Sequence, residues 1–277
     1  IATGKFALWN VALSSLFFRK KTIAIIHGTE VNLKHKLQKK MVDLALRTFE
    51  SIIAVSEYTK DFVSDLNRKV MVIPNGIDLS IWKNSDFDKL ELLSLVNSYP
   101  RLTTVGRLSK RKGQLNVIRH LPKLLKSFPN LHYHCIGLAN EIDMFLSVAK
   151  ELEVEANLSF HGPLDHKALC QILAETDVFL MLSSEDDNGD VEGFGIAILE
   201  ANAMGVPVIG SVGCGIKEAI SSNYSGRLIN PSSFEEFHLA LNDILHSRME
   251  YSERAKKWAK KHSWEKIIKQ YLKVIIG

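Results

Sequence analysis

The sequence has few of the features that mark secreted, metal-binding or membrane-spanning proteins. Its three cysteines, Cys135, Cys170 and Cys214, are widely spaced and form neither a disulfide framework nor a metal-ligand pattern. No apolar run approaches the ~20 residues that cross a bilayer. The longest, residues 6–18, ends at Arg19-Lys20-Lys21 and predicts an amphipathic helix rather than a signal peptide. A cytoplasmic chain is the simplest interpretation of these absences.

Charge and length narrow the possibilities further. Lys and Arg number 35 against 31 Asp and Glu, which leaves a net charge of +4. That excess is too small to indicate a nucleic-acid partner, although it suits an anionic substrate or membrane surface. The 277 residues are enough for roughly two domains, and the 46% apolar content allows a core in each.

Short apolar runs alternate with helical patterns almost throughout, which indicates a parallel α/β architecture. A polar stretch at 79–88 separates three strand candidates from six. The first group is 22–26, 52–55 and 70–73; the second is 102–105, 133–136, 158–160, 178–182, 206–209 and 227–229. Six strands complete a doubly wound unit, whereas three leave a long bare edge. We therefore expect the first domain to be incomplete, with an earlier segment missing.

The strongest chemical feature is Glu192-Gly193-Phe194-Gly195-Ile196, followed at the eighth position by Glu200. Glycines let the backbone approach a ligand, and free amides at a helix start favour phosphate or hydroxyl oxygens. A carboxylate accepts two hydroxyl hydrogen bonds, as a sugar or ribose would require. Without further context, two such glutamates are more often ordinary surface residues.

This segment resembles the E-G-F-G-x-x-x-x-E signature of retaining nucleotide-sugar glycosyltransferases of family four. The resemblance continues, in the family's order, at Ile52–Lys60, Val72–Asp78, Val105–Leu108 with Lys112-Gly113, and Ser263-Trp264. It implies the GT-B fold, with two Rossmann-like doubly wound parallel-sheet domains, here with the first incomplete. The implied divisions are an acceptor-side domain at 1–85, a nucleotide-sugar-binding domain at 86–262 and a C-terminal helix at 263–277 crossing back to the first domain.

The resemblance also implies roles for basic residues at strand ends. Arg107, after Gly106, and Lys112 would bind the donor's diphosphate and stabilise the charge that develops as the sugar leaves. Arg grips two oxygens and Lys supplies a compact charge. Arg111 stands where the family often has an acidic residue, so we expect a more positive local field. His27, after the strand at 22–26, would contact the donor sugar or its phosphate and face Glu192 across the cleft.

The implied donor site therefore combines catalytic His27, Glu192, Arg107 and Lys112 with donor contacts from Gly106, Gly193, Phe194, Gly195, Ile196 and Glu200. Glu192 would position sugar hydroxyls, and Glu200 would hold the ribose. We expect no cofactor and no metal. The D-x-D match at Asp86–Asp88 lies in the expected linker, and the acidic run Glu185–Asp190 lacks calcium-loop spacing. A role for that run in donor or acceptor selection is a weaker hypothesis.

The resulting prediction is a retaining glycosyltransferase that moves a sugar from a nucleotide donor to a hydroxyl of a glycan or glycolipid. Lys34, Lys36, Lys39 and Lys40, with Arg19–Lys21, form a basic cluster that would suit peripheral contact with an anionic inner membrane face. The alternatives are another GT-B enzyme, an epimerase or a phosphorylase, and a nucleotide-sugar-binding fragment without activity. The Gly213–Glu218 loop lacks a complete dinucleotide fingerprint. The family often has G-G-I-P-E here, whereas this chain reads Cys214-Gly215-Ile216-Lys217-Glu218, without the first Gly and the Pro.

Overall fold

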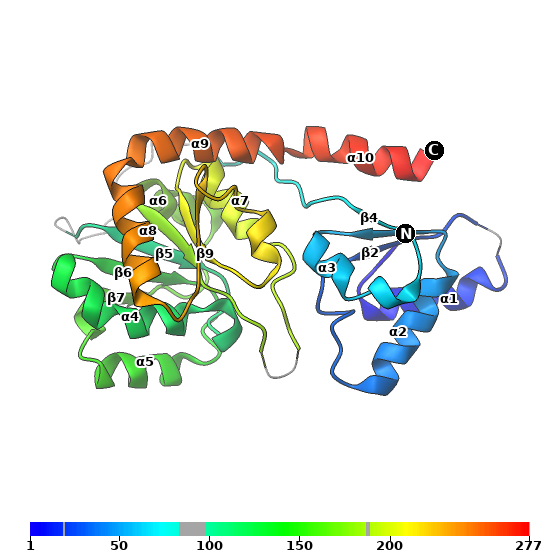
Figure 1. The fold of residues 1–277 in the computed structure, drawn as a ribbon, viewed down its shortest axis with the longest axis horizontal. Helices are drawn as coiled ribbons and strands as arrows, with labels where there is room; N and C mark the ends of the chain where they lie inside the picture. Colours follow the sequence, from blue (N-terminus) through cyan, green and yellow to red (C-terminus); the bar gives the residue numbers. More distant parts are fainter. Residues whose placement is uncertain (19, 83–97, 187–188, 277) are drawn as a thin grey trace.

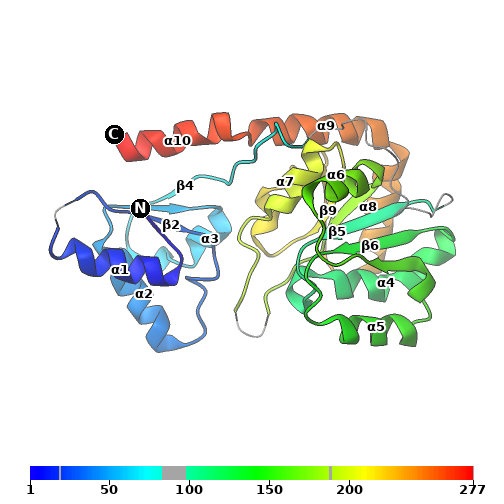
Figure 2. The same ribbon diagram turned by 180° about the vertical axis from the view of Figure 1, so that it is seen from behind.

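The computed structural model describes residues 1–18, 20–82, 98–186 and 189–276. Within these ranges the strands form two separate parallel sheets, each packed against helices (Figures 1 and 2). The first sheet has the order β1-β2-β3-β4 and the second β10-β9-β8-β5-β6-β7. This confirms the predicted α/β class with two Rossmann-like parallel-sheet units. The exact divisions at residues 85 and 262 stay predictions.

The first sheet is covered by helices from both ends of the chain. Leu8 and Ala12 of α1 pack with Val42 and Leu46 of α2 on one face of the sheet. Ile267 and Tyr271 of α10 pack on the other face. The elements are β1 (Ala2–Thr3), α1 (Lys5–Ser15), β2 (Ile23–Ile26), α2 (Lys36–Thr48), β3 (Ser51–Ala54), α3 (Glu57–Asp61) and β4 (Val70–Val72), with α10 (Trp264–Ile276).

The second sheet lies between two helical layers, because its strands are apolar on both faces. Helices α4, α5 and α8 cover one face, and α6, α7 and α9 cover the other (Figure 1). Its strands are β5 (Arg101–Val105), β6 (His132–Ile136), β7 (Leu158–Phe160), β8 (Val178–Met181), β9 (Val208–Ser211) and β10 (Gly226–Ile229). Its helices are α4 (Gln114–Ser127), α5 (Ile142–Glu151), α6 (His166–Glu175), α7 (Ile196–Ala203), α8 (Phe234–His246) and α9 (Arg248–Lys261).

The strand order of the second sheet positions the candidate site. Taken from β7 in order along the sheet, its strands follow the sequence 3-2-1-4-5-6, so the order reverses between β5 and β8. Ligands of open α/β sheets bind outside the carboxyl ends of the strands at such a switch point. The loops that follow β5 and β8 carry Arg107, Lys112 and Glu192.

Several local expectations need correction. The helix α1 is shorter than residues 6–18 and is apolar on more than one side, since Leu8 is buried while Phe6 and Leu13 are exposed. It is therefore not amphipathic. The first sheet also contains β1, which was not predicted. A strand of two residues is too short to show an alternating pattern in the sequence. The strand predicted at 206–209 is β9 at Val208–Ser211, because Pro207 has no N–H to donate to the ladder.

The chain passes between the two sheets twice, once after β4 and once between α9 and α10, and these two segments are hydrogen-bonded to each other. The Ile77 N–H donates to the His262 carbonyl (2.9 Å), and the Trp264 N–H donates to the Ile77 carbonyl (3.0 Å). Trp264 also packs closely on Gly76, where a Cβ would lie 2.7 Å from its ring. The break between α9 and α10 falls at His262 and Ser263. No helix in the described ranges joins the length and apolar character that crossing a bilayer demands.

Candidate active site

The loop after β5 presents two cations at the switch point. Arg107 and Gly106 directly follow the strand, and Gln114 of α4 holds the loop by donating to the Arg107 carbonyl (3.1 Å). Lys112 ends a short 3-10 turn before Gly113, which has φ +80° and would place a Cβ 2.0 Å from the Leu182 carbonyl oxygen. Only glycine fits there, because the turn packs tightly against the residue that follows β8. This packing fixes the backbone position of Lys112.

The segment before α7 faces this loop. Glu192 precedes Gly193, and Gly195 caps α7 with φ +87°. The Phe194 ring is buried in the core between the sheet and α7, so this residue has only its backbone to offer a ligand. Ile196, the first residue of α7, is exposed. The free amides at this helix start point to an oxygen-rich ligand.

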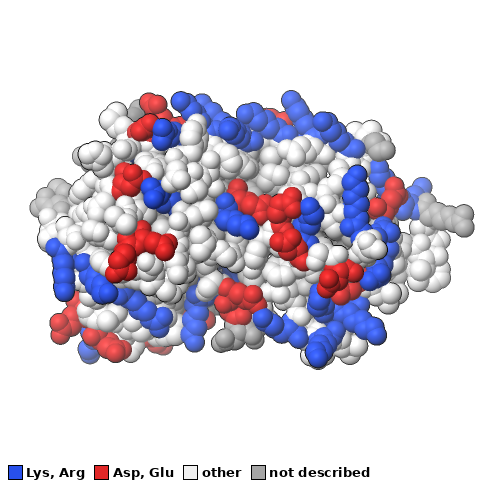
Figure 3. Space-filling view, in the orientation of Figure 1, with Lys and Arg blue, Asp and Glu red and all other residues white. Residues whose placement is uncertain are grey.

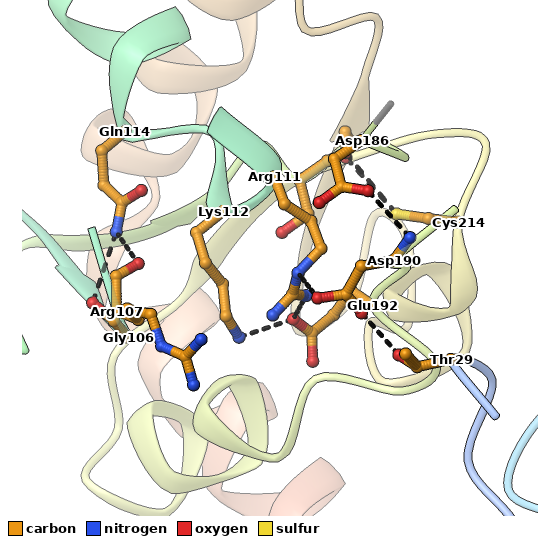
Figure 4. A network of polar contacts seen from close by, with 12 residues as sticks. Thr29, Gly106, Arg107, Arg111, Lys112, Gln114, Asp186, Asp190, Glu192 and Cys214 are labelled. Carbon is orange, nitrogen blue, oxygen red and sulfur yellow. Dashed lines mark hydrogen bonds and ion pairs between the residues drawn. The ribbon is translucent and has the colours of Figure 1, made fainter. Parts of the chain in front are cut away.

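The two loops meet in a network of ion pairs (Figure 4). The Lys112 Nζ lies 2.5 Å from Glu192 Oε2, and Arg111 Nη1 lies 2.6 Å from the same oxygen. The Arg111 Nε also lies 3.0 Å from Asp190 Oδ2. The side chains of Arg111, Lys112 and Glu192 are only 15–17% exposed, so solvent screens these contacts weakly. Arg107 is exposed, and in Figure 4 its guanidinium and the Lys112 ammonium point into the same region.

Glu200 lies deeper, in α7. Burial raises the pKa of its carboxyl group, while the nearby charges of His166 and Lys112 act in the opposite direction. Lys112, which is paired with Glu192, is also close enough to Glu200 for its charge to act on that carboxyl group. The structure thus brings together the four predicted residues Arg107, Lys112, Glu192 and Glu200.

The first sheet contributes the opposite wall. His27 follows β2 and is exposed, and a Cβ on Gly193 would lie 1.6 Å from the His27 carbonyl oxygen. The backbone of His27 is therefore in close contact with the residue after Glu192, while the role of its side chain toward the donor stays a prediction. Thr29 Oγ1 donates to Asp190 Oδ1 (2.5 Å), and Ser56 Oγ donates to the Gly193 carbonyl (2.7 Å).

The contacts of Arg111 and Glu218 at this interface differ from what the sequence predicts. Arg111 was expected to make the local field more positive, but Asp190 and Glu192 neutralise it. Glu218 accepts from the backbone amides of Glu57 (2.7 Å) and Tyr58 (3.0 Å), at the start of α3 in the first sheet's half. The family-like Gly215–Glu218 turn was the available signal, although its interdomain contact could not be predicted from spacing.

The acidic run has a structural role at the same interface. Glu185 pairs with Lys34, and the Asn32 side-chain amide donates to the Gly189 carbonyl (2.9 Å). Residues 187–188 of this run, the Asp86–Asp88 match and Arg19 lie outside the described residues. Among the residues that the structure describes, no group of three or more His, Cys, Asp or Glu side chains is arranged to hold a metal ion.

Two family models match consecutive parts of the chain. Residues 92–262 match the model described as "Glycosyl transferases group 1", and residues 2–81 match "Glycosyltransferase Family 4". A GDP-mannose-dependent monoacylated alpha-(1-6)-phosphatidylinositol monomannoside mannosyltransferase of Corynebacterium glutamicum is 26% identical over 236 residues. This match covers 81% of the chain but 61% of the relative, so the chain spans about three fifths of that protein's length.

Solved structures share the fold across nearly the whole chain. Anabaena Alr3699/HepE in complex with UDP superposes with a TM-score of 0.85 at 21% identity, covering 99% of this chain and 78% of that one. Sucrose-phosphate synthase from Thermosynechococcus elongatus gives a TM-score of 0.83 at 18% identity, covering 99% and 71%. With the first model matching well over half of its residues, the chain belongs to the glycosyl transferases group 1 family and has the GT-B fold.

Proposed function

We propose that this chain is a retaining glycosyltransferase that moves a sugar from a nucleotide-sugar donor to a hydroxyl of a glycan or glycolipid. The observation that carries the proposal is the convergence of Lys112, Glu192 and Arg107 at the switch point of the second sheet (Figure 4). A pair of cations beside the free amides of α7 suits a diphosphate, and the carboxylates suit hydroxyl groups.

In this proposal each residue has a distinct task. Arg107 and Lys112 stabilise the charge that grows on the nucleoside diphosphate while the sugar bond breaks. The amides of Gly193 to Ile196, with Gly106, approach the sugar or phosphate oxygens. Glu192 orients sugar hydroxyls, Glu200 holds the ribose, and His27 completes the site from the first sheet. The leaving phosphate accepts the acceptor's proton, so Glu192 is not assigned as a general base.

The first experiment is to identify the nucleotide base of the donor. The corynebacterial relative is named as GDP-mannose-dependent, and HepE was solved with UDP, which supports a guanosine or uridine donor. Thermal unfolding with UDP, GDP, ADP and their sugars would identify the donor, because a bound ligand stabilises the folded state by mass action. No stabilisation by any of them would contradict the donor site.

Product analysis then tests the reaction class. Transfer to a lipid or glycan acceptor with an unchanged anomeric configuration supports the proposal. Conversion of the donor sugar without an acceptor would instead indicate an epimerase, and a requirement for inorganic phosphate would indicate a phosphorylase. Donor binding without any turnover would indicate a binding fragment.

We further propose that the first sheet's helices contact an anionic membrane on its cytoplasmic side. Between α1 and α2 lies an apolar groove of about 370 Å³, lined by Trp9, Leu13, Leu16, Met41 and Leu44 among others. Lys20, Lys21 and Arg47 line the adjoining hollow, and Lys and Arg also gather around this half in Figure 3. An apolar strip with a basic rim suits the interface of an anionic bilayer. The name of the corynebacterial relative, which includes a phosphatidylinositol mannoside, supports this choice.

Vesicle flotation tests the membrane contact. We expect binding to vesicles with anionic lipids at low salt, less binding at high salt, and loss of binding in Leu13→Glu. The control Leu239→Glu places the same charge at an exposed leucine of α8 in the other half and should still bind. Binding that is indifferent to lipid charge and salt would reject the proposed electrostatic contact.

A further inference from the structure

We propose that Arg111 is a positioning residue that holds Glu192 and balances its charge while Lys112 turns toward the donor's diphosphate. The inference rests on the proposed function, because it requires a diphosphate at Lys112. Arg111 thereby has a task beyond adding positive charge to the loop.

The geometry separates a fixed cation from a movable one. The guanidinium of Arg111 is shared between two carboxylates, with Nε on Asp190 and Nη1 on Glu192. Turning toward another anion would break both contacts. Among the residues that the structure describes, Lys112 pairs with Glu192 alone, and its flexible stem carries a compact charge. Its Cε passes 3.3 Å from the position that a Cβ of Gly106 would take, on the side of the loop that carries Arg107.

The far end of Arg111 is also held. Asp190 Oδ1 accepts from Thr29 Oγ1 of the first sheet's half (2.5 Å), and the Asp190 N–H donates to Asp186 Oδ1 (2.9 Å). The contacts therefore run from Thr29 through Asp190, Arg111 and Glu192 to Lys112 (Figure 4). Because Asp190 is fixed at both sheets' loops, Arg111 is oriented toward Glu192 independently of Lys112.

Charge balance explains why this second cation matters. Glu192 is only 15% exposed, and a diphosphate brought close to it adds negative charge where solvent screens poorly. With Arg111 present, Glu192 keeps a counter-charge after Lys112 has turned away. Without Arg111, the diphosphate and Glu192 compete for Lys112, so nucleotide affinity falls although Arg111 does not touch the nucleotide.

A double-mutant cycle tests this indirect effect. Calorimetric titration with UDP and with GDP would compare the unmodified protein, Arg111→Ala, Glu192→Gln and the double variant. We expect Arg111→Ala to lose about tenfold or more in affinity, the lower end of the range for a charge-assisted hydrogen bond. In the Glu192→Gln background the same change should cost less than about threefold, because no carboxylate remains to compete for Lys112.

Two further variants keep the test interpretable. Arg111→Lys retains one cation near Glu192 and should recover part of the affinity; it carries the cycle if Arg111→Ala does not fold. Lys110→Ala removes an exposed cation from the same turn and should leave affinity unchanged. Thermal unfolding of every variant would show which of them fold.

The outcomes are distinct. An equal loss in both backgrounds would mean that Arg111 acts on the nucleotide directly or through its general field, and would overturn the inference. No loss in Arg111→Ala would overturn it as well. If the unmodified protein binds none of UDP, GDP and ADP, the proposed donor site fails first, and the inference fails with it.

Discussion

The ammonium nitrogen of Lys112 lies 2.5 Å from the Oε2 oxygen of Glu192, across the switch point of the second sheet. The cation assigned to the diphosphate and the carboxylate assigned to the sugar are therefore neighbours before any donor is bound. A bound donor would therefore have to compete with an existing ion pair. Substituting each residue in turn would measure how much it contributes to donor binding.

The two cations should each contribute to nucleotide binding. Lys112→Ala and Arg107→Ala are expected to weaken nucleoside-diphosphate binding by about 1.5–3 kcal/mol each, the range for hydrogen bonds to charged groups. Calorimetry with the nucleotide found by thermal unfolding would measure it. Lys110→Ala, on the same loop, is the matched control. Unchanged affinity in both variants would remove the donor-site assignment.

The two glutamates should differ in what they control. Glu200→Gln is expected to weaken nucleotide affinity, because the amide is a poorer acceptor for two ribose hydroxyls. Glu192→Gln is expected to lower turnover of the nucleotide sugar with little effect on affinity for the free nucleotide. Steady-state kinetics beside calorimetry would separate the effects, and the opposite pattern would mean that the two roles are exchanged.

The raised pKa of Glu200 predicts a pH dependence of nucleotide binding. Burial is the largest cause of that shift. The deprotonated carboxylate is the form that accepts the ribose hydroxyls, so on acidification affinity should begin to fall at a higher pH than for an ordinary glutamate. Affinity measured across mildly acidic pH should show this fall in the unmodified protein and a flatter profile in Glu200→Gln. Identical profiles would argue against Glu200 as the ribose ligand.

Glu218 should stabilise the contact between the two halves. Its carboxylate accepts two backbone N–H groups at the start of α3, from Glu57 and Tyr58. Glu218→Ala leaves both amides without this acceptor and is expected to lower the free energy of unfolding by about 1–2 kcal/mol. Urea unfolding would measure the loss. Lys217→Ala, at the exposed neighbouring position, should have little effect, and equal stability of the two variants would refute the contact's importance.

A histidine cluster on the second sheet predicts acid sensitivity. The His134 Nδ1 lies 3.0 Å from His161 Nε2, and the His132 Nε2 lies 2.8 Å from Ser159 Oγ. Burial, with the charges of neighbouring histidines and Arg101, lowers the pKa of His132 to about 4 and that of His134 to about 3. Burial also lowers the pKa of His161.

The sign of the effect follows from proton binding. The unfolded chain protonates these rings near pH 6.5 and the folded protein only at lower pH, so stability falls as the pH drops from about 6.5 toward 4. Unfolding in urea at pH 7.5 and pH 5.5 should show the loss. His134→Phe should lose less between the two pH values, while the exposed His246→Gln should behave like the unmodified protein. A loss in His134→Phe as large as in the unmodified protein would contradict the assignment.

The sequence predicted the architecture better than the interactions between its loops. All nine strand candidates correspond to strands of the two sheets, with β9 displaced past Pro207. Lys112 and Glu192 were assigned to one site from motifs, and they are paired. The partners of Arg111 and Glu218 could not be predicted from spacing. Arg111 meets Asp190 only when the loops after β5 and β8 come together within the second sheet, and Glu218 meets Glu57 and Tyr58 only when the two halves pack together.

The packing of α10 has a practical consequence for dissecting the protein. Ile267 and Tyr271 cover Ile23, Ile53 and Ile73, so the last helix in the sequence is part of the core of the first sheet. A cut in the linker would leave residues 1–82 with one apolar face open to water, and shortening the tail would damage the half that lies farthest from it in the sequence. A fragment meant to contain the first sheet should therefore also include α10, although α10 lies at the other end of the sequence.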